Sequence, residues 1–376
     1  MVVAVRRLGR LHVRVRRSNL IVDLPGVCKA LSDAPWNGGF TRVKYVVNHQ
    51  VPKHFECSSP REEMLRALKS VGIPPEEALG LMTAADVSHY STKTVSEGGL
   101  TVVCLATVGL TNARGVGEPP PMLEASPSTV NLIVFCDCDA TPTALVNALQ
   151  SAVEAKCNVF RSLDLRSATS GRPAIGTSTD TTSVVFSGVG RRFEYAGTAT
   201  DLGYLIGRAV TACLFTRLKS NGFVGRGVLE RLSERGVSLE DIVEAAVGGI
   251  VGPSPPSFEQ LFLEELGRTL SDPNVSSLIV AALRVEDESE WDMVPGLPKK
   301  LYRRDPAHVT SDEDIGEMIS RYIAGTRGVH NFRHYDRYKP GCLSRLPMFL
   351  DDALAGLIGG VASKVFSELG ERGGHT

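Results

Sequence analysis

Hydrophobic and polar positions divide the chain into two regions of different character. In the first region, short runs rich in Val, Thr and Ile predict β-strands over 42–48, 100–108, 130–136 and 182–186. Alternating apolar positions between Leu8 and Val15 predict a further strand whose basic residues face water. Apolar residues at helical spacing predict helices over 60–71, 74–79, 141–155 and 202–219. The pattern is typical of an α+β domain with a largely buried mixed β-sheet.

After Asn221-Gly222 the β-branched alternation fades and helical patterns dominate. They cover 228–235, 239–247, 257–270, 275–282, 312–324 and 349–369. The acidic stretch 286–290 follows one of these helices, and we expect it to be a solvated loop. The chain is therefore predicted to form two domains, an α+β domain over 1–222 and an all-α helical domain over 223–376.

Composition favours a soluble protein of the cytoplasm. The 376 residues are 43% hydrophobic and 22% charged, which is ordinary for globular proteins. No run reaches the roughly 18 consecutive apolar residues that a membrane span needs. The arginine-rich N-terminus lacks the apolar core of a signal peptide. Eight cysteines are scattered without a CxxC pair, which favours buried thiols over a disulfide framework.

The net charge of −1 conceals an asymmetry between the two regions. Residues 1–222 carry 24 basic and 18 acidic side chains, whereas residues 223–376 carry 17 and 24. Neither region has a basic stripe interleaved with aromatic residues, so we expect no nucleic-acid partner. The acidic second region can receive a phosphate group only with cations in between.

Hydroxyl and carboxylate side chains gather in one glycine-bearing segment of the first region, 171–180. Amide hydrolysis needs a nucleophile or activated water, a proton carrier and an oxyanion site. Thr177 and Thr179 lie beside Asp180 in this segment, and Glu154 is a candidate general base. The alternative is that the cluster forms only turns and caps.

Five segments of the first region, namely 80–86, 109–114, 129–131, 153–156 and 171–180, together resemble the adenosylcobinamide amidohydrolase family over roughly residues 20–220. The last departs from the family pattern at Ile175 and Ser178. The resemblance implies hydrolysis of the aminopropanol amide of adenosylcobinamide to adenosylcobyric acid and 1-amino-2-propanol. The expected substrate-binding residues are Asn48, Asp86, Asn112, Arg114 and Asn131. A non-catalytic corrinoid-binding module is the alternative.

Two adjacent carboxylates, Asp351 and Asp352, begin an otherwise apolar helix in the second region. Burying ionised carboxylates costs several kcal/mol each unless they are paired or bind a metal. Arg337 and Lys339 lie just upstream. Carboxylates for Mg²⁺ and cations for phosphate oxygens are what a metal-dependent phosphomonoesterase needs. A simple helix-capping role of the two aspartates is the alternative.

Together with segment 235–242 and Asn331-Phe332, these residues resemble the phosphatidylglycerophosphatase A-type superfamily over about 226–370. They look most like its soluble branch, which dephosphorylates α-ribazole phosphate. The resemblance implies Mg²⁺ held by Asp351 and Asp352 together with Asp241 or Glu240, and phosphate contacts from Arg337 and Lys339. The absence of a span and the corrinoid context favour α-ribazole phosphate over phosphatidylglycerophosphate, which stays the alternative. The whole chain then resembles an archaeal bifunctional fusion.

Overall fold

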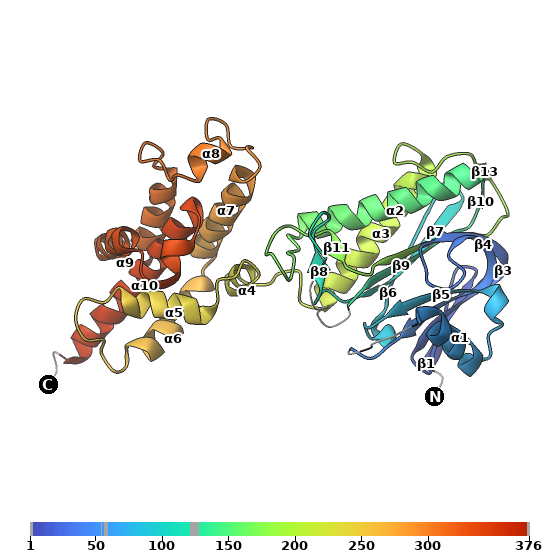
Figure 1. Cartoon of the computed structure of the whole chain (residues 1–376), viewed down its shortest axis with the longest axis horizontal. Helices are drawn as coiled ribbons and strands as arrows, with labels where there is room; N and C mark the ends of the chain where they lie inside the picture. The colour runs from blue at the N-terminus through green and yellow to red at the C-terminus, as the bar shows by residue number, and fades with distance from the viewer. Residues whose placement is uncertain (1–2, 54, 56–58, 121–127, 374–376) are drawn as a thin grey trace. The chain divides into compact units, whose positions relative to one another are not determined.

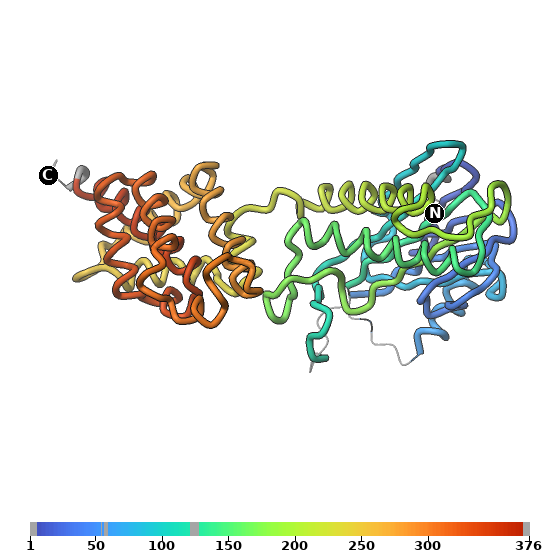
Figure 2. Tube along the Cα trace, turned by 90° about the horizontal axis from the view of Figure 1, so that it is seen from above, coloured from blue at the N-terminus to red at the C-terminus, as the bar shows by residue number. Residues whose placement is uncertain are grey.

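The computed structural model describes residues 3–53, 55, 59–120 and 128–373 (Figures 1 and 2). The chain divides into two compact units, Met1–Gly225 and Arg226–Thr376, and residues contact mainly others of their own unit. The first unit contains a mixed β-sheet with helices, and the described part of the second contains helices and turns. That each unit carries its own activity stays a prediction. None of the helices in the described ranges combines the length and apolarity that a membrane crossing requires.

The first unit is built on one large mixed sheet. Its strands are β1 (Val3–Leu8), β2 (Leu11–Arg16), β3 (Asn19–Ser32), β4 (Gly39–Gln50), β5 (Ala78–Thr83), β6 (Ser91–Glu97), β7 (Leu100–Val108), β9 (Val130–Cys136) and β12 (Thr181–Phe186). The strand order is β1-β2-β3-β12-β9-β7-β6, and β4 pairs with both β3 and β5. The β9–β12 and β4–β5 pairs are parallel, and the other pairs are antiparallel. The prediction of a mixed sheet is thus confirmed.

The sheet curls until β5 approaches β9. Asn131 on β9 donates a hydrogen bond to the backbone oxygen of Met82 on β5, at 2.7 Å. Two short pairs form separate two-stranded sheets: β8 (Ala113–Arg114) with β11 (Gly176–Thr177), and β10 (Asp139–Ala140) with β13 (Arg192–Phe193). The β8–β11 pair joins two of the segments that carried the family resemblance.

Alternation along the central strands supplies both faces of the sheet with apolar side chains. Leu132 and Val134 of β9 face one core, and Ile133 and Phe135 face the other. Helices α2 (Pro142–Ser162) and α3 (Asp201–Ser220) pack side by side on the first face (Figure 1). Helix α1 (Pro60–Val71) packs near β4 and β5. Each of the three helices begins with a Ser or Thr side chain that caps a backbone N–H.

One predicted helix of the first unit is wrong. Over 74–79 the chain forms a single 3₁₀ turn, η1 (Pro75–Glu77), and then enters β5. The β5 sequence is a short apolar run that is buried on both faces, so it has no periodicity that separates strand from helix. A second 3₁₀ turn, η2 (Val87–His89), follows β5.

The described part of the second unit is helical, as predicted. Its elements are α4 (Val228–Ser233), α5 (Leu239–Gly248), α6 (Phe258–Leu270), α7 (Pro273–Ser289), α8 (Lys299–Tyr302), α9 (Ser311–Tyr338), η3 (Gly341–Arg345) and α10 (Met348–Gly373). Helix α10 contacts α5, α6, α7 and α9, and it is buried from Met348 to Ser363. This burial explains why the helix is apolar on all sides.

The acidic stretch 286–290 is not the solvated loop that we expected. Helix α7 runs through it to Ser289, and Glu286 is buried. The Glu286 carboxylate accepts a hydrogen bond from the backbone N–H of Phe349, at 3.2 Å. Burial raises the pKa of Glu286 to about 8. Its partner is distant in sequence, so the local pattern gave no sign of the contact.

Helix α9 consists of two segments. At Ala324 and Gly325 the backbone leaves the helical region, and Gly325 has a φ of +61°. A residue with a side chain adopts that conformation only with strain. The earlier segment agrees with the helix predicted over 312–324. The later segment, from Thr326 onward, carries Arg337.

Helices α9 and α10 pack closely at two glycines, Gly316 and Gly356. A Cβ added at Gly356 would lie 2.3 Å from the backbone oxygen of Gly316. We expect Gly356→Ala to lower the free energy of local unfolding of α9 and α10 by about 1–3 kcal/mol. The added methyl group would force the two helix backbones apart. Hydrogen exchange of α9 and α10 peptides, read by mass spectrometry, measures the change.

Gly267→Ala is the matched control. Gly267 lies on the exposed side of α6 with open space around its added Cβ. Alanine there should stabilise the helix by about 1 kcal/mol because it reduces backbone entropy in the unfolded chain. Equal destabilisation by both variants would contradict the packing explanation.

Candidate functional sites

A buried polar network lies in the first unit where strands β4, β7 and β9 meet. Asn131 on β9 is in register with Thr107 on β7. Asn48, near the end of β4, donates to the Thr107 hydroxyl and accepts from the Asn131 amide, each at 2.9 Å. All three side chains are about 1% exposed. The structure therefore brings together two of the predicted substrate-binding residues, Asn48 and Asn131.

Asn131 of this network and Asn112, which follows β7, each have a side-chain oxygen that accepts no hydrogen bond from the described residues. The Oδ1 atoms of Asn131 and Asn112 are buried and have no hydrogen-bond partner among the described residues. Asn112 donates through Nδ2 to the Ser178 hydroxyl, at 2.8 Å. A buried acceptor without a donor costs about 1–3 kcal/mol. Both oxygens are therefore suited to accept an N–H or O–H group from a ligand.

Asp180 is the centre of a second group of contacts in the first unit. Its Oδ1 accepts hydrogen bonds from the backbone N–H of Val130, at 3.0 Å, and from the Thr177 hydroxyl. Its Oδ2 accepts from the ammonium of Lys156 on α2, at 2.6 Å. The Lys156 and Asp180 side chains are only 9% and 10% exposed. The pair is thus a buried ion pair with a hydroxyl attached to it.

Glycine at position 176 allows this arrangement. A Cβ there would lie 2.2 Å from Oδ2 of Asp180 and 3.2 Å from Nζ of Lys156. Thr179 lies close by, and its hydroxyl is 2.6 Å from that of Thr129. Three of the four predicted catalytic residues, Thr177, Thr179 and Asp180, therefore lie together, on the segment that precedes β12.

Glu154, the fourth predicted catalytic residue, lies elsewhere. It is on the exposed side of α2, where it accepts a hydrogen bond from Gln150 at 2.9 Å. Lys156 is two residues later, about 200° around the helix, and faces the core. The signal that could have identified Lys156 is its place on the buried stripe of α2, one turn after Ala152 and one before Phe160.

Asp86 and Arg114 make local contacts. Asp86 is about half exposed, and its carboxylate caps η2 by accepting a hydrogen bond from the backbone N–H of Ser88. Hydrogen bonds from Ser88 lower the pKa of the Asp86 carboxyl. The Asp86 carboxylate also contacts the His89 ring, at 2.8 Å. Arg114 donates to the backbone oxygen of Pro119 and lies on β8, next to β11. Of these two residues, only Arg114 lies on a strand that pairs with the strand of Thr177.

The second unit gathers carboxylates at the starts of two helices. Oxygens of Asp312 and Glu313, from the start of α9, and of Asp352, from the start of α10, lie within 4.8 Å of one another. Burial and the neighbouring carboxylates raise the pKa of Asp312 and of Asp352 well above the usual range. Burial also raises the pKa of Asp351 to about 6.

These carboxylates have oxygens that nothing in the described chain satisfies. Both oxygens of Asp312 and one each of Glu313, Asp351 and Asp352 are buried without a hydrogen-bond partner. Without a cation, carboxylate oxygens can lie this close together only if they share protons. Several carboxylate oxygens converging on one point are the ligands that a hard cation such as Mg²⁺ prefers. The residues present therefore fit a divalent cation.

The predicted residues of the second unit are placed around this cluster in different ways. Lys339 forms an ion pair with Asp351. Asp241 instead completes a capping box with Ser238 at the start of α5 and forms an ion pair with Arg345. Arg337 is exposed on α9. Asp312 and Glu313 were missed because acidic residues in the first turn are typical of any helix start.

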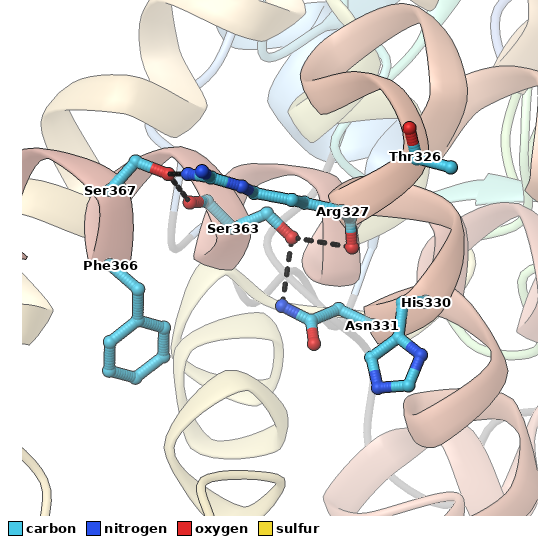
Figure 3. Close-up of a pocket in the computed structure, with 7 residues that line it drawn as sticks. All are labelled: Thr326, Arg327, His330, Asn331, Ser363, Phe366 and Ser367. Carbon is cyan, nitrogen blue, oxygen red and sulfur yellow. Dashed lines mark hydrogen bonds between the residues drawn. The ribbon is translucent and has the colours of Figure 1, made fainter.

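Figure 3 shows a different cavity, of about 440 Å³, between the later segment of α9 and the end of α10. Asn331 donates to the Ser363 hydroxyl at 2.8 Å, and Arg327 donates to that of Ser367 at 2.9 Å. The predicted site residues do not line this cavity. Its polar groups largely satisfy one another, which is typical of a structural contact.

Comparisons with solved structures give only weak similarities. The low temperature requirement C protein of Listeria monocytogenes matches with a TM-score of 0.33 and 20% identity, over 38% of this chain and 93% of that one. A β-aminopeptidase of Burkholderia matches with a TM-score of 0.32 and 12% identity, over 57% and 81%. Similarities of this size support no inference about fold or activity.

Sequence comparisons are more specific. An uncharacterized protein of Methanocaldococcus jannaschii is 46% identical over 107 residues, which cover 27% of this chain and 81% of that protein. The adenosylcobinamide amidohydrolase of Methanosarcina mazei is 28% identical over 195 residues, which cover 50% of this chain and 88% of that enzyme. The family model described as adenosylcobinamide amidohydrolase matches residues 5–222, more than half of the chain. The chain therefore belongs to the adenosylcobinamide amidohydrolase family.

Proposed function

We propose that the first unit hydrolyses the aminopropanol amide of adenosylcobinamide, giving adenosylcobyric acid and 1-amino-2-propanol. Family membership supports the substrate class and a role in cobalamin salvage. The observation that carries the chemistry is the hydrogen-bonded chain of Thr177, Asp180 and Lys156. It offers a hydroxyl, a proton acceptor and a fixed cation within one buried group.

In the proposed mechanism the Thr177 hydroxyl attacks the amide carbon while Asp180 accepts its proton. Lys156 occupies the second oxygen of Asp180, so that the first oxygen faces Thr177. The tetrahedral intermediate collapses as the C–N bond breaks, and the proton from Asp180 passes to the departing amine. Water then hydrolyses the Thr177 ester to the carboxylic acid. The free Oδ1 atoms of Asn112 and Asn131 accept N–H groups of corrinoid carboxamides.

Purified protein incubated with adenosylcobinamide should form adenosylcobyric acid, detected by chromatography. Thr177→Ala should lower the rate by roughly a thousandfold or more, because the attacking group is lost. Thr177→Ser keeps the hydroxyl and should retain much of the activity. Thr216→Ala, on the exposed side of α3, is the control and should be unaffected. Absence of product from folded protein would refute the amidase. A wild-type rate in Thr177→Ala would refute the nucleophile.

Lys156→Met tests the ion pair through stability. The variant leaves Asp180 buried without its cation, which should destabilise the first unit by about 3 kcal/mol. Hydrogen exchange of peptides from β9 and β12 measures the change. Arg10→Met breaks a pair with Asp137 in which the arginine is 47% exposed, and should cost no more than about 1 kcal/mol. Equal effects of the two variants would contradict a buried pair.

We propose further that the second unit is a Mg²⁺-dependent phosphomonoesterase that acts on α-ribazole phosphate. The partnerless oxygens of Asp312, Glu313 and Asp352 support this second activity. When bound there, Mg²⁺ would neutralise phosphate charge and polarise the phosphoryl group. Lys339 holds the Asp351 carboxylate and supplies a second positive charge. Both proposed substrates are water-soluble small molecules, which suits a cytoplasmic enzyme.

Mg²⁺ should raise the melting temperature of the second unit, because a cation that binds only the folded state stabilises it by about 2.7 kcal/mol at a hundred times its Kd. Asp352→Asn should abolish both this shift and phosphate release, while amide hydrolysis continues. Asp314→Asn, an exposed neighbour in the first turn of α9, should keep both. Faster phosphate release from phosphatidylglycerophosphate than from α-ribazole phosphate would favour the lipid alternative.

A further inference from the structure

A cavity of about 280 Å³ lies in the second unit beside Asp351. The cavity is lined by Arg303, Lys339 and Arg345, which are basic, and by Glu290, Asp305 and Asp351, which are acidic. Asp351 is 5% exposed, and one of its oxygens has no hydrogen-bond partner among the described residues. This cavity, here called the cation cavity, is separate in its lining from the one in Figure 3.

Each cation of the cavity is held by a carboxylate. Lys339 pairs with Asp351, and Arg303 pairs with Glu290 at 3.2 Å. Arg345 pairs with Asp241, whose other oxygen accepts two hydrogen bonds from Ser238, each at 2.8 Å. The start of α5 thus fixes the carboxylate that holds Arg345. Asp241 is bonded on both oxygens, which leaves it poorly suited to bind a metal.

The backbone at Lys339 is unusual and serves this arrangement. Lys339 ends α9 in the left-handed conformation, with a φ of +41°. Residues other than glycine adopt it rarely, and they persist there only when the surrounding structure requires it. The turn places the Lys339 ammonium against Asp351 and within 4 Å of Asp305 and Asp336. The cavity therefore contains a cation in a fixed position.

We propose that the cation cavity binds the phosphate group of a phosphomonoester, with Lys339 as the fixed cation and Arg345 as a guanidinium clamp. Asp241 is then a positioning residue that orients Arg345. The reaction and the Mg²⁺ dependence rest on the phosphatase site proposed above, whereas the role of Arg345 in phosphate binding is tested without hydrolysis. Guanidinium groups suit this role because their planar donors match pairs of phosphate oxygens.

The net charge of the cavity lining affects how strongly the cavity can bind phosphate. Three basic and three acidic side chains line the cavity, so it offers a dianion no net attraction. A divalent cation on the nearby carboxylates of Asp312, Glu313 and Asp352 would offset two of their negative charges and so weaken the repulsion of a phosphate dianion. Phosphate binding should therefore depend on Mg²⁺ as well as on Arg345.

Titration calorimetry of the full chain with inorganic phosphate, in the presence and absence of Mg²⁺, tests the site. Wild-type protein should bind phosphate only with Mg²⁺. Arg345→Gln should weaken binding by about tenfold to a hundredfold, the usual effect of losing a hydrogen bond to a charged group. Arg304→Gln, an exposed arginine outside the cavity lining, is the matched control and should bind as the wild type does.

Asp241→Asn separates positioning from folding. It should weaken phosphate binding in the wild-type background and have no further effect in the Arg345→Gln background, because the two residues act together. Losses that simply add in the double variant would overturn the positioning role.

Binding by Arg345→Gln equal to the wild type, or no binding by a chain that releases phosphate from α-ribazole phosphate, would overturn the cavity proposal alone. Arg345-dependent binding without hydrolysis of any phosphomonoester would support the cavity and refute the phosphatase.

Discussion

The buried ion pair of Lys156 and Asp180 holds the candidate site of the first unit together. Withdrawing two such charges from water costs several kcal/mol for each ion, so the pair persists only with further partners. Asp180 has them in the Val130 N–H and the Thr177 hydroxyl. These contacts tie α2, the start of β9 and the segment before β12 to one carboxylate. The hydroxyl that we propose as the attacking group is thus positioned by the same interaction that satisfies the buried charge.

The second unit also buries carboxylates, and among its described residues only some of them are paired with a cation. Lys339 neutralises Asp351, but oxygens of Asp312, Glu313 and Asp352 have no partner among the described residues. The raised pKa values of Asp312 and Asp352 express this deficit, since burial and neighbouring carboxylates favour the protonated forms. Protons and a divalent cation therefore compete for the same oxygens. A site of this kind is stable only when one of them is bound.

Local pattern predicted most elements and part of each site. Strands over 100–108 and 130–136 and the helix over 60–71 match the structure to the residue, because their apolar runs and caps are strong local signals. Thr177 and Asp180 were predicted together because they are neighbours in sequence. Lys156 was not, since its partner is 24 residues away. Glu286 was likewise misplaced in a loop, because its partner lies on another helix.

Hydrogen bonds already made, rather than the count of acidic residues, distinguish the groups suited to bind a ligand. Asp241 looks like a metal ligand in sequence, but both its oxygens are bonded, to Ser238 and to Arg345. A cation there would have to replace those bonds. Both oxygens of Asp312 lack a hydrogen-bond partner among the described residues, so a cation there would displace only a proton. The same criterion separates Asn131, whose buried Oδ1 has no partner among the described residues, from Asp86, whose oxygens are bonded to Ser88 and His89. Since buried acceptors are costly when unmet, the chain retains them most readily where a ligand completes them.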